Sequence, residues 1–411
     1  MRAYERLLKY TKYPAASDSS SQSFPSSPEQ LTFGKALVEE MLAIGIEDAH
    51  MDENGYVFGT IESNIENWDG PVIGFIAHMD VVRDVPYTDI KPRIVENYDG
   101  GDIVLNSEEN IVLSPMEYET LQTYRGHDLI VTDGTTLLGA DNRAGIAEIL
   151  TMAETLLNDP DIKHGTVKIG FTPDEEIGRG ADRFDVERFG ADFAYTVDGG
   201  AFGEVVYETF NAATATVTVK GRNIHPGTAK NKMLNAALIA MEFNALLPAV
   251  QRPEHTEGYE GFYHLIQMEG SVEEAKLVYL LRDHAAAQFA EQKARIKRAA
   301  EWLNQNYGEG TVTVSIVDSY KNMVEQVKQH WHLIETAYEA VREMGGTPIT
   351  IPVRGGTDGA RLSFLGLPCP NLGTGSHNHH SKLEYASVQA MDQCVSLLVK
   401  IAEKYGKLDR I

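Results

Sequence analysis

Hydrophobic and polar residues alternate along the first half of the chain in blocks that are typical of helices and strands in turn. Apolar residues recur at helical spacing from Leu31 to Ile44 and again from Arg143 to Leu157. Four other runs are rich in β-branched and aromatic residues and are bounded by Gly or Pro, as strands are: "NGYVFGTI", "PVIGFIAHMD", "GTVKIGFTP" and "DFAYTVDGG". This alternation predicts an α/β fold built on a layered sheet.

A polar, Ser-rich stretch near the N-terminus, Ala16 to Gln30, stands apart from this pattern. It lies directly before the first of the two predicted helices. We therefore expect it to form an ordered loop or a capping turn that leads into that helix.

The pattern changes after about Tyr207. The run "ATATVTVKG" alternates with period two, a helical run follows, and "FYHLIQMEGSVEEAKLVYLLRD" predicts two strands joined by a turn. A charged helical run and the strand-like "GTVTVSIVDSY" complete the order β-α-β-β-α-β, which is that of a ferredoxin-like unit. We therefore expect residues 208–317 to form an inserted α+β domain and residues 1–207 and 318–411 to form one domain around it.

Composition and charge narrow the classes of partner and site. Lys and Arg total 36 against 60 Asp and Glu, a net charge of −24, which argues against a nucleic-acid or anionic-membrane partner. The two Cys are too few for a disulfide framework or a thiolate zinc site, so any metal must be held by His and carboxylate. A signal-peptide pattern and an apolar run of about 18 residues are both missing, so we expect a cytoplasmic protein.

Acidic residues and a histidine follow the predicted strands at the points where the strands end. Each has an ordinary explanation: a surface pair for His78 and Asp80, a helix N-cap for Asp141, and a solvated turn for the acids of "FTPDEE". However, ligands collect at the carboxyl ends of strands in an open α/β sheet, and Asp198 in "AYTVDGG" ends another strand there. Together these positions predict a metal site at one edge of the sheet.

The C-terminal run "GTGSHNHHSKLEY" offers His377, His379 and His380, which could be a surface patch or the remaining ligands. Oxygen and imidazole donors without thiolate suit zinc, with manganese or cobalt as substitutes. A carboxylate shared between two ions would hold them about 3.5–4 Å apart. If one of Glu175 and Glu176 binds metal, the other can act as general base, since neighbouring side chains diverge from a loop.

These motifs resemble the co-catalytic zinc exopeptidase family that also contains carboxypeptidase G and acyl-amino-acid deacylases, and within it the tripeptide aminopeptidases. The likeness extends over almost the whole chain. It implies a catalytic domain with a mixed central sheet flanked by helices, an inserted lid and dimerisation domain, two zinc ions and a homodimer. The runs that carry it are "IVENYDGGDIVL", "TLLGADNRAGIAEI", "FTPDEEIGRGA", "YTVDGG", "HPGTAKNKM", "TEGYEGFYHL" and "RGGTDGARLSFLGLPCPNL".

The resemblance implies a ligand set, in which one zinc is bound by His78 and Asp198, the other by Glu176 and His380, and both by Asp141. It also implies a cis peptide bond after Asp141. The family pattern near the last ligand resembles "NYH", whereas this chain has "NHH", so His379 competes with His380 for the role.

The resemblance assigns further roles around this centre. Glu175 would be the general base, Asp80 would hold His78, and Asp174 would face away as a turn residue. In the inserted domain, His225 of "IHPGT" would stabilise the oxyanion, although a His at a strand edge explains it equally well. Arginines can hold a peptide carboxylate or make structural ion pairs, and Arg282 and Arg354 are the candidates for the first role.

The implied reaction is the release of the N-terminal residue from a tripeptide by a water activated between two zinc ions. The substrate would be a small peptide with a free N-terminus. A dipeptidase, a carboxypeptidase or an N-acyl amino acid deacylase could use the same metal centre. A non-catalytic peptide-binding protein of this fold would be expected to have lost a ligand or the base, and none is missing from this sequence.

Overall fold

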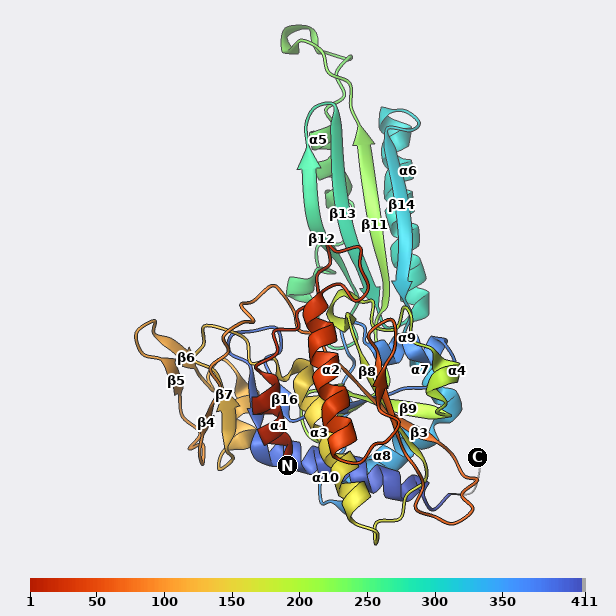
Figure 1. Cartoon of the computed structure of the whole chain (residues 1–411). Coiled ribbons are helices and arrows are strands. Elements are labelled where there is room, and N and C mark those ends of the chain that lie inside the picture. The colour runs from red at the N-terminus through yellow and green to blue at the C-terminus, as the bar shows by residue number, and fades with distance from the viewer. Residues whose placement is uncertain (409–411) are drawn as a thin grey trace. The chain divides into compact units, whose positions relative to one another are not determined.

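A computed structural model describes residues 1–408 of the chain and divides it into two compact units (Figure 1). The first unit comprises Met1–Tyr207, Glu325–Thr350 and the part from Thr357 onward. The second unit comprises Glu208–Val324 and Ile351–Gly356.

The first unit is built on a seven-stranded mixed sheet with the strand order β1-β2-β8-β3-β9-β15-β10. Strands β8, β3, β9 and β15 run parallel. Strands β2 and β10 pair antiparallel with β8 and β15, and β1 pairs antiparallel with β2. Strand β3 is buried at every position, as expected for a parallel strand that is covered on both faces. The strands are β1 (His50–Met51), β2 (Val57–Ile61), β3 (Ile73–His78), β8 (Val167–Thr172), β9 (Phe193–Gly199), β10 (Val205–Val206) and β15 (Asn371–Gly373).

Helix α3 is the central helix of this unit. It packs against β3 and β9, and α1 and α10 pack against it in turn. Gly145 allows the close approach, because a Cβ there would lie 1.9 Å from the carbonyl oxygen of Val197 in β9. The helices are α1 (Ala3–Tyr10), α2 (Pro28–Ala43), α3 (Ala140–Asn158), α4 (Val186–Phe189), α7 (Val324–Val327), α8 (His332–Glu343), α9 (Asp358–Phe364) and α10 (Val388–Tyr405).

Shorter elements complete the first unit. A four-stranded sheet has the order β16-β17-β7-β4, and β5 and β6 form a separate pair. These strands are β4 (Arg93–Val95), β5 (Ile103–Asn106), β6 (Ile111–Leu113), β7 (Leu129–Val131), β16 (Ser376–His377) and β17 (Tyr385–Ser387). The 3-10 turns of the chain are η1 (Glu119–Tyr124), η2 (Glu175–Ile177), η3 (Pro226–Thr228), η4 (Pro253–His255) and η5 (Lys328–His330).

The second unit has the predicted order β-α-β-β-α-β. Its antiparallel sheet has the strand order β12-β13-β11-β14, and α5 and α6 pack on it. Burial alternates along β11, which explains the period-two pattern of that run. The elements are β11 (Asn211–Lys220), α5 (Ala236–Ala245), β12 (Phe262–Gly270), β13 (Glu274–Asp283), α6 (Ala286–Tyr307) and β14 (Val312–Tyr320).

The second unit ends later than the sequence analysis placed it. Strand β14 still pairs with β11 at Tyr320, beyond the expected boundary at residue 317. The unit also includes residues 351–356, because Val353 N–H donates to the carbonyl of Glu208 and Phe210 N–H donates to that of Gly355. The α/β class with a mixed central sheet, and the ferredoxin-like unit, are confirmed.

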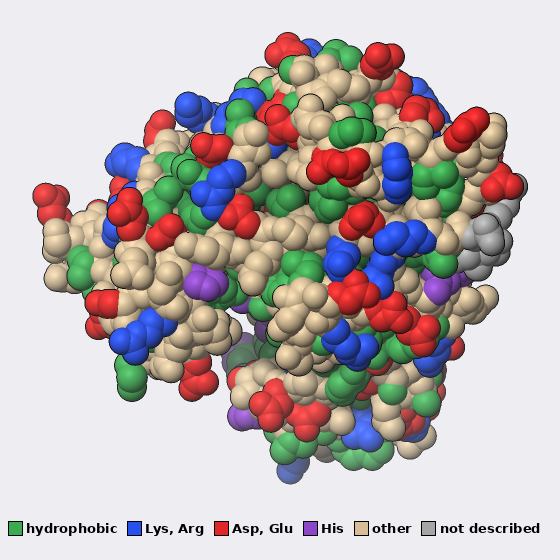
Figure 2. Space-filling model, turned by 90° about the horizontal axis from the view of Figure 1, so that it is seen from below, with side chains coloured by type: hydrophobic (Ala, Val, Ile, Leu, Met, Phe, Trp, Pro, Cys, Tyr) green, Lys and Arg blue, Asp and Glu red, His purple; other side chains and the backbone are tan. Residues whose placement is uncertain are grey.

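The surface carries acidic and basic side chains together. Figure 2 shows one face on which Asp and Glu lie interspersed with Lys and Arg rather than gathered in one patch. None of the helices in the described part of the chain is long and apolar enough to cross a membrane.

Candidate metal centre

The five predicted metal ligands lie together in the first unit. Their ligand atoms form two groups, each with all members within 4.8 Å of one another, and Asp141 belongs to both. Strands β3, β8 and β9 run parallel, so their carboxyl ends lie side by side. Residues at or just after these ends therefore meet, although they are distant in the sequence. One group is His78, Asp141 and Asp198, and the other is Asp141, Glu176 and His380.

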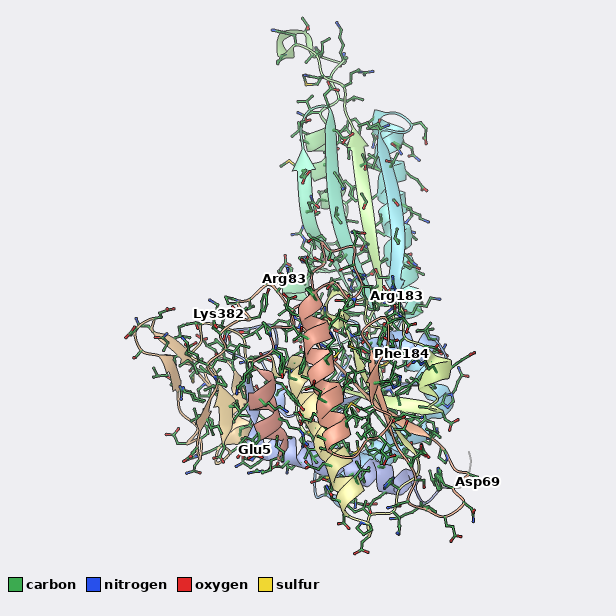
Figure 3. The ribbon with its side chains drawn as sticks, viewed as in Figure 1. Glu5, Asp69, Arg83, Arg183, Phe184 and Lys382 are labelled. Atoms are coloured by element: carbon green, nitrogen blue, oxygen red, sulfur yellow. The ribbon has the colours of Figure 1, made fainter. Side chains whose placement is uncertain are left out.

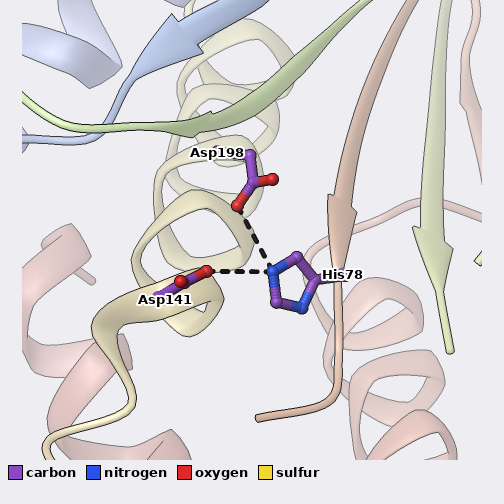
Figure 4. Close-up of side chains that lie close together, drawn as sticks. All are labelled: His78, Asp141 and Asp198. Carbon is purple, nitrogen blue, oxygen red and sulfur yellow. Dashed lines mark hydrogen bonds and ion pairs between the residues drawn. The ribbon is translucent and has the colours of Figure 1, made fainter. Parts of the chain in front are cut away.

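The first group is centred on the imidazole of His78, which ends β3 and is 3% exposed (Figure 4). Its Nε2 lies 2.9 Å from Oδ1 of Asp141 and 3.3 Å from Oδ1 of Asp198. Its Nδ1 lies 3.0 Å from the backbone carbonyl oxygen of Asp80 and 3.4 Å from Oδ1 of the same residue. Asp80 therefore orients the ring chiefly through its carbonyl, leaving Nε2 to face the two carboxylates.

The second group lies on the other side of Asp141. His380 Nε2 is 2.8 Å from Oε2 of Glu176 and 3.1 Å from Oδ2 of Asp141. His379 Nδ1 is 3.6 Å from the same Oδ2, and its Nε2 pairs with the hydroxyl of Ser376 at 2.9 Å. The geometry thus favours His380 over His379. The two oxygens of Asp141 face the two groups separately, as a bridging carboxylate requires.

His377 lies outside both groups. Its Nε2 pairs with the hydroxyl of Tyr124 at 2.6 Å, and burial lowers its pKa to about 4. Of the three C-terminal histidines, this one contributes to the packing of the β16-β17-β7-β4 sheet rather than to the cluster of acids.

The charges of this cluster fit cations. Burial alone would lower the pKa of His78, but the carboxylates of Asp198, Asp141 and Asp80 raise it well above its usual value. Hydrogen bonds to Asp141 and Glu176 raise the pKa of His380 to about 11. Several carboxylates thus surround each imidazole, and bound cations would offset their negative charge.

One buried atom also fits a metal. Among the described residues, Oε1 of Glu176 is buried without a hydrogen-bond partner, although burying a carboxylate oxygen unpaired is costly. The donor set consists of carboxylate oxygens and imidazole nitrogens without thiolate, which suits zinc, manganese or cobalt. The residues present therefore fit a centre of two divalent cations.

The helix-cap explanation for Asp141 is wrong. The N-cap of α3 is Gly139, with φ of 71°, and Asp141 has non-helical backbone angles inside the first turn. Its carboxylate pairs with histidines instead of capping the helix. The cis peptide bond that the family resemblance implied is present between Asp141 and Asn142.

The three acids of the "DEE" run have different environments in the structure. Asp174 has φ of 59° and is fully buried, with its carboxylate bonded to Ser26 and Gln30. Glu175 and Glu176 begin η2, and burial raises the pKa of Glu175 well above its usual value. Burial likewise raises the pKa of Glu176 to about 7. The run is therefore not a solvated acidic turn.

Two buried acids near the centre were missed by the sequence analysis. Glu384 accepts hydrogen bonds from the backbone N–H groups of Leu138, Gly139 and Asp141, at 2.9, 2.6 and 3.0 Å. Asp358 accepts a hydrogen bond from the hydroxyl of Thr172 at 2.7 Å, and burial raises its pKa to about 7. Both residues lie in sequence runs quoted above, but a single acid without a spacing pattern does not by itself indicate a functional residue.

The three remaining candidates belong to the second unit, so their approach to the metal centre stays a prediction. His225 caps η3, and its Nδ1 accepts a hydrogen bond from Gly227 N–H at 3.1 Å. Arg282 Nη1 donates to two backbone carbonyls of its own sheet. Arg354 donates to two carbonyls through Nη1 and to one hydroxyl through Nη2, all in the segment 256–260.

The mixed sheet, the two adjoining ligand groups and the ferredoxin-like second unit define a class, the peptidases with a two-cation centre and an inserted α+β domain. Residues 207–311 match the family described as a peptidase dimerisation domain. Peptidase T of Alkaliphilus oremlandii is 56% identical to this chain over 98% of it and 99% of that protein. Peptidase T of Caldanaerobacter subterraneus is 54% identical over 99% of each. The chain belongs to the peptidase T family.

Solved structures share the fold. Aminopeptidase PepT from Bacillus cereus superposes with a TM-score of 0.78 at 24% identity, covering 99% of this chain and 98% of that one. The YXEP protein of Bacillus subtilis, described as a dinuclear metal binding peptidase from the M20 family, superposes with a TM-score of 0.66 at 15% identity over 98% of each chain. The family assignment and the peptidase class drawn from the sequence are confirmed.

Proposed function

We propose that this protein is a tripeptide aminopeptidase that uses two divalent cations, zinc in the first place, to cleave the N-terminal residue from small peptides. The proposal rests on the positions of the two carboxylate oxygens of Asp141. Its Oδ1 faces His78, while its Oδ2 faces His380. A single cation would need only one of these groups. Cations held by these residues would lower the pKa of a bound water and would polarise the scissile carbonyl.

Glu175 acts as general base and then as general acid. It lies in the turn after β8 that also carries Glu176, and its carboxyl group interacts electrostatically with His78 and Asp198, although neither ligand group contains it. Burial raises its pKa well above the usual value, which suits a group that must take a proton from water and return it to the leaving amine.

His225 donates to the oxyanion that forms on the substrate. Because its Nδ1 accepts a hydrogen bond from the backbone of Gly227, the proton of the neutral ring sits on Nε2. That nitrogen is then a donor with a fixed orientation, as oxyanion stabilisation requires.

Of the two candidate arginines, Arg282 rather than Arg354 binds the C-terminal carboxylate of the peptide. Three hydrogen bonds already tie the Arg354 guanidinium to the segment 256–260, where it also stacks over Phe210 and Phe262. This arrangement gives Arg354 a structural role within the second unit. Arg282 makes two hydrogen bonds, from Nη1 to the carbonyls of Ala213 and Leu281, and its guanidinium lies 5.5 Å from the ring of Tyr320, so fewer contacts hold it than hold Arg354.

The protein acts as a homodimer through the second unit. Strand β12 is an edge strand with Ile266 and Met268 exposed, and the neighbouring helix α5 exposes Leu238 and Met241. Exposed apolar side chains beside an unpaired strand edge favour association with another chain.

The experiment that tests the function measures bound metal and hydrolysis of a tripeptide before and after chelation and after zinc is restored. We expect two ions per chain and activity that disappears and returns with them. A parallel panel of dipeptides, N-blocked peptides and tripeptides separates the alternatives, because an aminopeptidase rejects a blocked amine. Rapid hydrolysis of N-acyl amino acids or of dipeptides, with tripeptides left intact, would contradict the proposal.

A further inference from the structure

The turn that carries the proposed base is held in place by side chains from two other parts of the first unit. Three consecutive backbone N–H groups donate to side-chain oxygens. That of Asp174 donates to Oε1 of Gln30 at 2.9 Å, and those of Glu175 and Glu176 donate to Oδ1 and Oδ2 of Asp80 at 3.0 and 3.1 Å. The orientation of this turn therefore depends on Gln30 as well as on Asp80.

Gln30 and Asp174 bind each other twice. The amide Nε2 of Gln30 donates to Oδ1 of Asp174 at 2.7 Å, while the amide oxygen accepts from the Asp174 backbone. Both residues are fully buried. Ser26 supplies its backbone N–H to the other carboxylate oxygen at 2.8 Å, and its hydroxyl also bonds to Asp174. A buried carboxylate needs such partners, and Gln meets the needs of both the carboxylate and the adjacent N–H.

Further contacts attach the same N-terminal segment to the chain beyond the turn. Arg179 donates to the carbonyl of Ser23 at 2.8 Å, and the guanidinium groups of Arg179 and Arg183 lie 5.3 and 4.7 Å from the ring of Phe24. Figure 3 marks Arg183 and the adjacent Phe184, which is buried among aromatic rings of the first unit. The Ser-rich stretch thus supports the segment that follows the "DEE" run.

We infer that Gln30 is a positioning residue for Glu175. Gln30 fixes the left-handed turn at Asp174, and that turn sets where the next side chain points. The inference rests on the proposed function, in which Glu175 is the base. A misplacement of about 1 Å at a reacting group can cost about 100-fold in rate, and loss of supporting contacts around a metal site costs about 10–100-fold.

The test compares Gln30→Met with Gln22→Met in the same segment, where the side chain is exposed. Gln30→Met keeps the length of the side chain and removes both hydrogen bonds to Asp174, together with those that the amide donates to Ser26 and Ser27. We expect Gln30→Met to lower kcat for a tripeptide about 10–100-fold, with KM within about twofold and two metal ions still bound. Gln22→Met should behave like the unmodified protein. A kcat for Gln30→Met equal to that of Gln22→Met, or a loss of metal that accounts for the loss of rate, would overturn the inference.

A second variant, Gln30→Glu, separates positioning from a general loss of stability. When ionised, the introduced carboxyl repels Asp174 and cannot donate to it, whereas when protonated it can donate as the amide did. The ratio of its kcat to that of the unmodified protein should therefore rise as pH falls, and a ratio independent of pH would count against the inference. If Glu175→Ala retains turnover, the proposed base is wrong. If Glu175→Ala is inactive while Gln30→Met is fully active, the Gln30 inference alone fails.

Discussion

The carboxylate of Glu384 accepts a hydrogen bond from the backbone N–H of Asp141 at 3.0 Å. Glu384 is 2% exposed and also accepts from the two residues that precede α3, Leu138 and Gly139. A single buried carboxylate thus holds the loop that presents the shared ligand of both groups.

Replacing Glu384 with Ala should weaken metal binding, because three buried N–H groups would lose their acceptor and the Asp141 loop would lose its support. Each unpaired group costs about 1–3 kcal/mol, and loss of such outer contacts lowers metal affinity about 10–100-fold. Zinc titration and thermal unfolding of the metal-free variant would measure the two effects. The exposed Glu187→Ala serves as the control. Unchanged affinity in Glu384→Ala would show that the loop holds its shape without this residue.

Glu175→Ala should retain two metal ions and lose turnover, since the base touches water but neither ligand group contains it. General base catalysis contributes about 10²–10⁴-fold, so kcat should fall by that factor. Glu176→Ala, by contrast, should lose metal, because its carboxylate faces His380. Metal analysis beside steady-state kinetics distinguishes them. Loss of metal from Glu175→Ala would make that residue a ligand and reverse the assignment.

His380→Ala should lose one of the two ions, whereas His379→Ala should keep both. His380 pairs with Asp141 and Glu176, while His379 is held by Ser376 at 2.9 Å. Each of these two variants is the control for the other. Elemental analysis measures the number of metal ions that each variant binds. The opposite result would place the ligand at His379.

Metal affinity should rise with pH. The hydrogen bonds to carboxylates raise the pKa of His380 to about 11 in the metal-free centre, and burial raises that of Glu176 to about 7. Both groups must lose their protons to bind a cation, so binding releases protons and the site competes with them at low pH. For each proton released, metal affinity should increase about tenfold per pH unit. The increase should stop at the pH at which that group has already lost its proton in the metal-free protein. Zinc titrations across neutral pH check this, and a flat profile would show that the histidine binds metal without displacing a proton.

The double change Leu238→Glu and Met241→Glu should convert a homodimer to a monomer. These side chains are 57% and 60% exposed on α5 next to the edge strand β12, and charges there would repel their copies in the partner. Met116→Glu, at an 86% exposed position of the first unit, is the matched control. Light scattering after size-exclusion chromatography measures the mass. If the double variant stays dimeric, the interface lies elsewhere.

Much of this fold can be predicted because its patterns are local. Period-two alternation in β11 and helical spacing in α3 follow from which face of each element is buried. The boundary of the second unit could not be predicted, because residues 351–356 join it through hydrogen bonds to the segment just before β11. Such pairing depends on the path of the chain and leaves no periodic signal.

The candidate ligands likewise include some that the local sequence predicts and some that only the tertiary structure decides. His78 and Asp198 end strands or lie near their ends, and the ends of parallel strands meet whatever the intervening sequence, so the residue types and positions alone point to a metal site. The choice of His380 over His379 depends on a loop conformation that two adjacent histidines cannot specify. The supporting roles of Gln30 and Glu384 likewise arise only when segments more than 100 residues apart fold against the site. A hydrogen bond between distant residues requires an oriented donor and acceptor within about 3 Å, and only the folded chain sets that distance.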